Sequence, residues 1–408
     1  MGHLTVTIVD APCGAGKTTY AIQMMNKSIQ QEGDNRFIFI TPFCSEIKRI
    51  KAECPGFYEP CDGGRSRTKS ADFKKLLQDG KNIVSTHALF KLIDKEALEL
   101  IQMDNYTLIL DEVMDVLEKE PIFKSDLRLL LDQGYIVIDG DDATVKATDK
   151  SEEYLKGNFK KFLNNARMNR FIYLEENLLM WQFPPDIFQA FETSYILTYL
   201  FDGQIQKAYF DLHGVGYEYK TVNKTPDGYG LTDLKVDYDR EFRNMLRDNV
   251  NIYEGRLNKI DEPSNALSRG WFEDKKNAHL IAKAKAAQYN FFHNIVRGRS
   301  GEIMWTCFKA NKEVLKGAGY SRGFVSHNTR ATNEYRDRKS LSYMINKYPL
   351  APVTMYFNRK GIAFDWDKYA VSEFIQWLLR SQIRDGKPVN LFLPSRRMRT
   401  LFREWMVD

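Results

Sequence analysis

The segment Ala11-Pro12-Cys13-Gly14-Ala15-Gly16-Lys17-Thr18 constrains the fold more than any other part of the chain. It follows the apolar run Leu4–Val9 and precedes apolar residues at helical spacing, which is the strand–loop–helix context of a phosphate-binding loop. Glycines let such a loop turn tightly so that its N–H groups face phosphates, and the helix N-terminus adds a favourable dipole. The simpler alternative is a glycine-rich turn before an ordinary helix.

This loop predicts a site for ATP and Mg²⁺. Lys17 is expected to reach the β- and γ-phosphates, and the Thr18 hydroxyl is expected to bind Mg²⁺. The residues expected to contact the nucleotide are Pro12, Cys13, Gly14, Ala15, Gly16, Lys17, Thr18 and Thr19.

An acidic pair follows a second apolar run. Asp111 and Glu112 come directly after Thr107–Leu110, where a strand would present them at the same sheet edge as the loop. We expect Asp111 to hold the Mg²⁺ and Glu112 to orient and deprotonate the attacking water. Taken alone, such a pair is also compatible with a surface turn.

Apolar runs alternate with helix-like stretches, which predicts an α/β fold with parallel sheets flanked by helices. The expected strands are Leu4–Val9, Phe37–Ile40, Ile83–Val84, Thr107–Leu110, Tyr195–Thr198, Ile303–Phe308 and Val389–Leu393, and the expected late helices are Asp367–Leu379 and Ser395–Trp405. Residues 121–190 and 204–300 show no clear pattern. A chain of 408 residues is long enough for two domains.

Composition narrows the class of protein. Five scattered cysteines argue against a disulfide framework, and no apolar stretch is long enough for a membrane helix. A strand-like start without a secretory signal favours the cytoplasm. Residues 320–408 carry 16 Lys and Arg against 8 Asp and Glu, although the whole chain is only +5. An uneven basic charge of this kind favours a polyanion partner.

With these motifs in order, the chain resembles superfamily 2 helicases of the DEAD/DEAH-box-like group, closest in pattern to members encoded by bacteriophages. The resemblance is carried by the loop ending in Gly16-Lys17-Thr18 and by Asp111-Glu112-Val113-Met114. It implies two RecA-like lobes, with inserted segments, that hydrolyse ATP between them. Thr41 and Pro42 match the family's motif Ia, and Thr86 and His87 match its Thr-His segment. These four residues are therefore expected to contact nucleic acid.

Two later segments extend the resemblance. Gln376 to Arg384 is similar to motif VI, in which a glutamine and arginines close on ATP from the second lobe. On one helix, Gln376, Arg380 and Arg384 would share a stripe, with either arginine as the finger. Arg330 lies in a segment similar to motif V of phage helicase-like proteins, where it would contact a phosphate.

The resemblance predicts a first lobe at 1–202, a linker or accessory segment with the start of the second lobe at 203–300, and the rest of the second lobe at 301–408. Only ten residues precede Ala11, too few for the adenine-reading glutamine motif of DEAD-box RNA helicases. Single-stranded DNA is therefore favoured over RNA as the substrate of an ATP-dependent helicase or translocase, with replication or recombination proteins as candidate partners. The alternatives are a terminase-like packaging ATPase, a nucleotide kinase, and a nucleic-acid-dependent ATPase switch that does not translocate.

Overall fold

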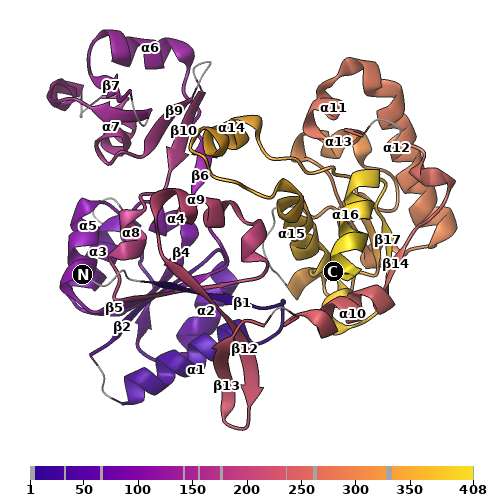
Figure 1. Ribbon diagram of the computed structural model, residues 1–408, viewed down its shortest axis with the longest axis horizontal. Coiled ribbons are helices and arrows are strands. Elements are labelled where there is room, and N and C mark those ends of the chain that lie inside the picture. Colours follow the sequence, from indigo (N-terminus) through magenta and orange to yellow (C-terminus); the bar gives the residue numbers. More distant parts are fainter. Residues whose placement is uncertain are drawn as a thin grey trace. The chain divides into compact units, whose positions relative to one another are not determined.

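The computed structural model describes residues 5–31, 34–64, 68–140, 143–154, 157–174, 178–235, 237–260, 264–327 and 333–407. The chain divides into two units (Figure 1). The first comprises Met1–Asp10, Gly16–Asp233 and Leu350–Phe364. The second comprises Ala11–Ala15, Leu234–Pro349 and Asp365–Asp408.

The first unit is built on an eight-stranded sheet with the order β13-β12-β1-β11-β5-β2-β4-β3. Neighbouring strands are parallel except β12 and β13, which form an antiparallel hairpin. The strands are β1 (Val6–Asp10), β2 (Arg36–Thr41), β3 (Phe57–Tyr58), β4 (Asn82–Thr86), β5 (Tyr106–Asp111), β11 (Thr193–Thr198), β12 (Tyr217–Thr225) and β13 (Gly228–Asp233). Strands β1 and β5 are buried along their whole length, as expected for a parallel sheet covered on both faces.

Helices follow most of these strands. They are α1 (Lys17–Gln30), α2 (Cys44–Glu53), α3 (Lys69–Gln78), α4 (His87–Phe90), α5 (Lys95–Met103), α8 (Asp186–Gln189) and α9 (Ile205–His213). Helix α14 (Ala351–Arg359) also belongs to this unit, although it lies far along the chain. The parallel sheet with its helices confirms the predicted fold class.

The stretch without a sequence pattern forms a small sheet of its own. Its strands are β6 (Leu117–Lys119), β7 (Ile136–Ile138), β8 (Thr144–Ala147), β9 (Phe171–Leu174) and β10 (Leu178–Gln182), with helices α6 (Lys124–Asp132) and α7 (Lys160–Arg167). All its pairings are antiparallel, in the order β6-β10-β9-β8-β7. The insertion leaves the main sheet after β5 and returns before β11. A cavity of about 680 Å³ separates it from α14, with Phe123, Leu179 and Met355 in the lining.

The second unit contains a four-stranded parallel sheet in the order β14-β17-β16-β15. Its strands are β14 (Val250–Ile252), β15 (Ile303–Thr306), β16 (Ser340–Tyr343) and β17 (Val389–Phe392), and its helices are α10 (Arg240–Asn249), α11 (Arg269–Glu273), α12 (Ala278–Asn290), α13 (Lys312–Leu315), α15 (Trp366–Leu378) and α16 (Arg396–Val407). Trp271, Phe292 and Trp305 are buried in one apolar cluster beside this sheet. The aromatic residues of this region therefore serve mainly as core.

The observed units differ from the predicted boundaries at two places. Strands β12 and β13 extend the first sheet, so the first unit continues to Asp233 and not to 202. Residues Leu350–Phe364 then return to the first unit from within the expected second lobe. The hairpin carries no strong apolar period in the sequence, because β12 and β13 are only partly buried.

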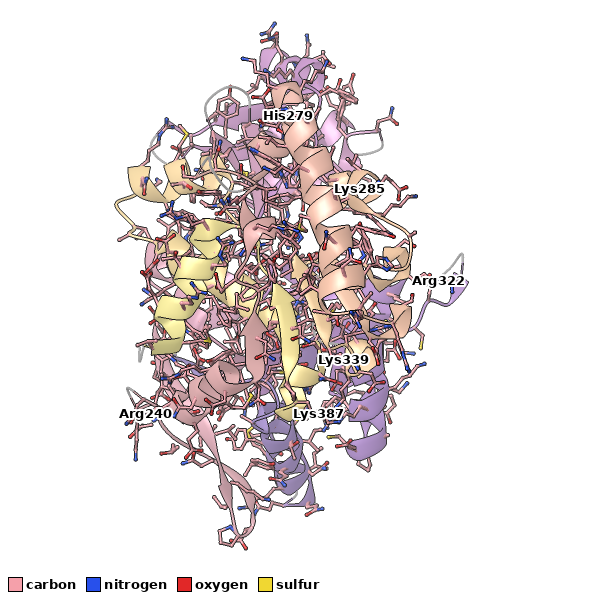
Figure 2. The ribbon with its side chains drawn as sticks, turned by 90° about the vertical axis from the view of Figure 1, so that its right-hand side faces the viewer. Arg240, His279, Lys285, Arg322, Lys339 and Lys387 are labelled. Carbon is pink, nitrogen blue, oxygen red and sulfur yellow. The ribbon has the colours of Figure 1, made fainter. Side chains whose placement is uncertain are left out.

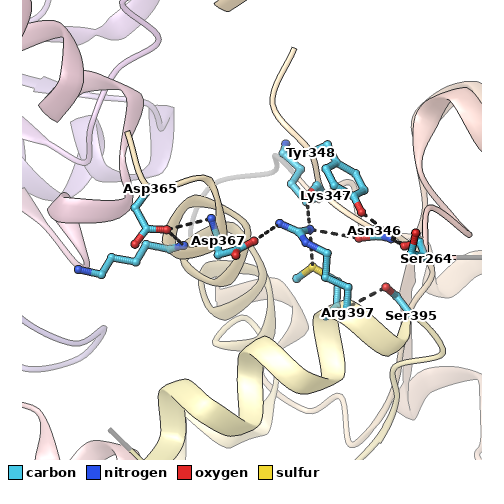
Figure 3. A network of polar contacts seen from close by, with 10 residues as sticks. Ser264, Asn346, Lys347, Tyr348, Asp365, Asp367, Ser395 and Arg397 are labelled. Atoms are coloured by element: carbon cyan, nitrogen blue, oxygen red, sulfur yellow. Dashed lines mark hydrogen bonds and ion pairs between the residues drawn. The ribbon is translucent and has the colours of Figure 1, made fainter. Parts of the chain in front are cut away.

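Arg397 at the start of helix α16 makes polar contacts with neighbouring segments of its unit (Figure 3). The guanidinium donates to Asn346 Oδ1 at 3.2 Å and to the Lys347 carbonyl at 2.7 Å, and it forms an ion pair with Asp367. It also lies 4.3 Å from the centre of the Tyr348 ring. This arginine of the basic C-terminal region is therefore occupied by contacts within the protein.

The five cysteines form no disulfide with one another in the structure. Within the described ranges, the structure contains no helix with the length and apolar character needed to cross a membrane.

Candidate nucleotide-binding site

The phosphate-binding loop connects β1 to α1. Gly14 and Gly16 adopt left-handed φ values of +88° and +102°, which glycine accepts without a steric cost. Gly16 is the N-cap of α1 and offers no side-chain cap to the first N–H groups of the helix. Lys17 is buried at the first helical position. This arrangement leaves the positive end of the helix dipole for an anionic ligand.

Asp111 ends β5, and three polar side chains of the first unit contact its carboxyl group or its backbone carbonyl. The Thr18 hydroxyl lies 3.5 Å from Asp111 Oδ1, and the Thr41 hydroxyl donates to Oδ2 at 3.2 Å. The His87 ring Nε2 lies 3.1 Å from the Asp111 carbonyl oxygen. The sheet thus brings together residues from β2, β5, α1 and α4 at the carboxyl ends of its strands.

Burial raises the pKa of Asp111 to about 7, and the nearby Glu112 and Glu46 carboxylates add to this shift. A divalent cation between Thr18 and Asp111 would oppose all three effects, because it stabilises the ionised carboxylate. The oxygen donors present therefore fit Mg²⁺, which prefers hard oxygen ligands together with substrate phosphates.

Glu112 has an unusual backbone. Its φ is +66°, a left-handed value that costs a non-glycine residue about 1–3 kcal/mol and collects at functional sites. The Glu112 N–H donates to the Leu197 carbonyl of β11 at 2.9 Å, which fixes the turn. The backbone of Glu112 is therefore held at the sheet edge directly after Asp111.

Sequence reasoning missed two residues that brace this edge. Asp10 accepts hydrogen bonds from the N–H groups of Leu200 and Phe201, at 3.0 and 2.9 Å, so it fixes the segment that follows β11. Gln206 of α9 accepts from Met114 N at 2.9 Å and so holds the chain after the acidic pair. The position of Asp10 at the end of an apolar run was the only available signal.

A third missed residue is Tyr229 of β13. Its ring lies against Gly16, since a Cβ atom at Gly16 would come within 2.3 Å of the tyrosine Cε1. The Tyr229 N–H donates to Gln23 Oε1 of α1 at 2.9 Å. Sequence reasoning had no signal for this contact, because 213 residues separate the two positions.

The residues expected to contact nucleic acid have varied surroundings. Thr41 is fully buried and binds Asp111, Thr86 caps α4 by accepting from Leu89 N at 3.3 Å, and His87 is buried. Pro42 is half-buried after β2. Arg330 lies outside the described residues.

The predicted helical stripe of the second unit is not formed. Helix α15 ends at Leu378, so it carries Gln376 but not Arg380 or Arg384. The helix stops because the Ser381 hydroxyl donates to the Leu378 carbonyl at 2.7 Å and accepts from Ile383 N, which begins a separate short helix at Gln382–Asp385. Arg380 is buried and donates to the Ser326 carbonyl at 3.2 Å, whereas Arg384 is half-buried.

Comparisons with known proteins agree with this architecture. Residues 3–117 match the family "Type III restriction enzyme, res subunit", 117–181 match the "YonV middle domain", and 244–406 match the "YonV C-terminal Rossmann-like domain". The first match covers both the phosphate-binding loop and the acidic pair. Together, these features place the chain in the helicase-like class of superfamily 2 that its motifs predicted.

A full-length relative defines the family within that class. The chain is 42% identical, over 98% of both sequences, to the "SPbeta prophage-derived uncharacterized protein YonV" of Bacillus subtilis (strain 168). The chain belongs to the YonV family, and its expected link to phage-encoded proteins is confirmed.

Solved helicase structures show a weaker likeness. The structure of S. tokodaii Xpd4 is 12% identical, with 98% of this chain and 94% of that chain covered and a TM-score of 0.45. The DUF1998 helicase MrfA bound to DNA is 14% identical, with coverage of 99% and 49% and a TM-score of 0.34. TM-scores of this size do not establish a common fold.

Proposed function

We propose that this protein is an ATPase that couples hydrolysis to movement on, or unwinding of, nucleic acid, with single-stranded DNA favoured over RNA. The observation that carries the proposal is the convergence of Thr18, Thr41 and Asp111 beside the N-terminus of α1. A nucleoside triphosphate with a divalent cation has the charge and the hard oxygen atoms that such a site accommodates.

The residues of the first unit support distinct roles in hydrolysis. Lys17 and the N–H groups at the start of α1 would neutralise the phosphates, while Thr18 and Asp111 would hold Mg²⁺. When bound, Mg²⁺ would polarise the phosphoryl oxygens and neutralise developing charge. Glu112, which follows Asp111 on a backbone with a left-handed φ, would orient water and accept its proton.

The second unit is proposed to supply an arginine to the nucleotide. Arg384 is the better candidate, because the Arg380 guanidinium is buried and donates to the carbonyls of Ser326 and His327. Arg380 is then a positioning residue for the segment that precedes the proposed motif V.

Basic residues of the second unit support a polyanionic partner. Figure 2 shows one face that carries side chains from several of its elements. The labelled residues are Arg240, His279, Lys285, Arg322, Lys339 and Lys387. Lysine and arginine on one surface favour binding to phosphate backbones with little dependence on sequence. The prophage origin of the Bacillus subtilis relative supports action in the cytoplasm of a bacterial host.

The contacts of the C-terminal acids do not favour a terminase-like nuclease. Asp365 caps α15, Asp367 pairs with Arg397, and Glu373 pairs with Lys347 at 3.1 Å. Each of these carboxylates therefore has its own partner in the protein. Across the described residues, no group of three or more His, Cys, Asp or Glu side chains is placed to hold a metal ion.

The test is an ATPase assay with and without single-stranded DNA, double-stranded DNA and RNA. Lys17→Ala is expected to lower hydrolysis by roughly 100-fold or more, the effect of removing one electrostatic contact to a transition state. Lys27→Ala, which changes an exposed lysine of the same helix, is the matched control and should retain the wild-type rate. Hydrolysis by the wild type that responds to no nucleic acid would contradict the coupling.

A further inference from the structure

The β12–β13 hairpin reaches beyond the edge of the sheet beside the phosphate-binding loop (Figure 1). Strand β12 pairs with β1 from Val6 opposite Tyr217 to Val9 opposite Lys220. It then continues to Thr225, so residues 221–225 extend roughly 16 Å past the last pair at 3.3 Å per residue. Since the two strands are parallel, this extension lies at the carboxyl edge, where the chain leaves β1 to enter the loop.

Two contacts hold the returning strand β13 on α1. A Cβ atom at Gly228 would come within 2.6 Å of Gln23 Oε1, and that same oxygen accepts the Tyr229 N–H at 2.9 Å. The backbone of Tyr229 is therefore fixed to α1 while its half-buried ring lies against Gly16. An aromatic ring is thus held beside the residue that opens the helix.

The strand order indicates which part of a nucleotide this ring would meet. β11 separates β1 from β5, and a metal ion held by Thr18 and Asp111 would lie on the β5 side of β1. An extended nucleotide whose γ-phosphate points toward β5 directs its nucleoside toward the other side of β1. On that side, the sheet continues with β12 and β13.

We propose that Tyr229 forms the nucleobase-binding surface of the ATP site, and this inference rests on the function proposed above. The ring supplies a flat apolar face for stacking, with Lys224 directly opposite it across the hairpin. Every base has a π-face, so stacking discriminates little between bases. A site of this kind binds different nucleobases through their π-faces.

The test compares two ligands that differ in the nucleoside. Equilibrium binding of ADP and of inorganic tripolyphosphate, each with Mg²⁺, is measured by calorimetry on the full-length chain and its variants. Tyr229→Ala is expected to weaken ADP binding about 10-fold, the size of one lost base–aromatic stack, while tripolyphosphate binding is unchanged. Tyr229→Phe retains the ring and is expected to bind ADP like the wild type.

Tyr58→Ala is the matched control, because Tyr58 is a partly exposed tyrosine on β3 at the other edge of the same sheet. Equal weakening of both ligands by Tyr229→Ala would show that the ring supports the loop, and unchanged or tighter ADP binding would show that it contacts no base. Each of these results overturns the inference. Absence of binding of either ligand by the wild type would instead overturn the proposed nucleotide site itself.

Discussion

Thr41 shows how a neighbouring hydroxyl tunes a buried carboxyl group. Its hydrogen bond to Asp111 Oδ2 favours the ionised form and so lowers the pKa of Asp111, against the larger upward effect of burial. The proposed Mg²⁺ site requires the ionised form. Removal of the hydroxyl should therefore move the onset of activity to higher pH.

We expect Thr41→Val to shift the acidic limb of the pH–rate profile of ATP hydrolysis upward, with a smaller change at alkaline pH. The substitution preserves shape but removes the donor. Thr7→Val, which removes a hydroxyl that donates to Glu218 in the same sheet, is the control. An unshifted profile would show that Thr41 does not tune the acidic site.

His327 provides a pH-dependent term in the stability of the second unit. Burial lowers the pKa of His327 to about 4, and the positive charges of Lys347, Arg380 and Arg269 act in the same direction, whereas Glu373 opposes them. Because the folded pKa lies below the unfolded value, the unfolded chain binds the proton first. The contribution of neutral His327 to the free energy of unfolding is therefore complete above about pH 6.5. It decreases as the pH falls toward 4.

The free energy of unfolding should fall by at most roughly 3 kcal/mol from this residue between pH 7 and pH 4. His327→Gln is expected to reduce that pH dependence, as measured by urea unfolding at several pH values. His279→Gln changes an exposed histidine of the same unit and should leave the dependence intact. Identical pH dependence in the wild type and His327→Gln would refute the assignment.

Among single residues, the sequence could predict the site residues that belong to a short motif. Lys17, Thr18 and Asp111 follow from a strand, a loop and a helix read in order. Asp10 and Tyr229 could not be predicted, because their contacts with Leu200 and Gly16 depend on which strands become neighbours. No local pattern encodes that order.

Among the elements, α16 packs through buried apolar residues such as Phe402 and is also held by polar contacts of Arg397. The Arg397 side chain is mostly buried. Its guanidinium contacts two oxygen acceptors, one carboxylate and one aromatic ring of the protein in place of water. Its loss would leave the Lys347 carbonyl and Asn346 Oδ1 without this donor. The cost of unsatisfied partners of this kind is about 1–3 kcal/mol.

Arg397→Ala should therefore lower the free energy of unfolding by about 2 kcal/mol, and Arg397→Lys should recover only part of it, because lysine lacks the planar fork. Urea unfolding monitored by tryptophan fluorescence measures the change. Arg396→Ala, at an exposed position one residue earlier, is the control and should be near neutral. Equal stability of Arg397→Ala and the wild type would contradict the structural role.

Helices and strands could be predicted where burial requires a clear pattern of apolar residues in the sequence. Strands β1, β2, β5 and β11 consist of apolar runs covered on both faces, and each was expected within about two residues of its observed position. The β12–β13 hairpin is partly exposed and mixes tyrosines with charged residues, so its period is weak. The end of α15 depends on the Ser381 hydroxyl, which helical spacing does not reveal.

Over the whole molecule, the distribution of charge could be predicted from the sequence, whereas the ion pairs and the path of the chain could not. The excess of basic residues in 320–408 could be counted from the sequence. The sequence could not show which of these basic residues form ion pairs within the protein, because pairs such as Arg336–Asp385 and Lys347–Glu373 depend on the fold. The path of the chain, which enters the first unit a second time, has no sequence signal.

Helix α14 gives this path a practical consequence. Tyr356 is 7% exposed and Phe357 is fully buried, so the helix supplies apolar surface to a unit whose other residues were synthesised more than a hundred positions earlier. During translation, the first unit must wait for this late segment before its surface is complete. A fragment that stops at Asp233 should accordingly aggregate, and adding residues 350–364 through a designed linker should restore its solubility.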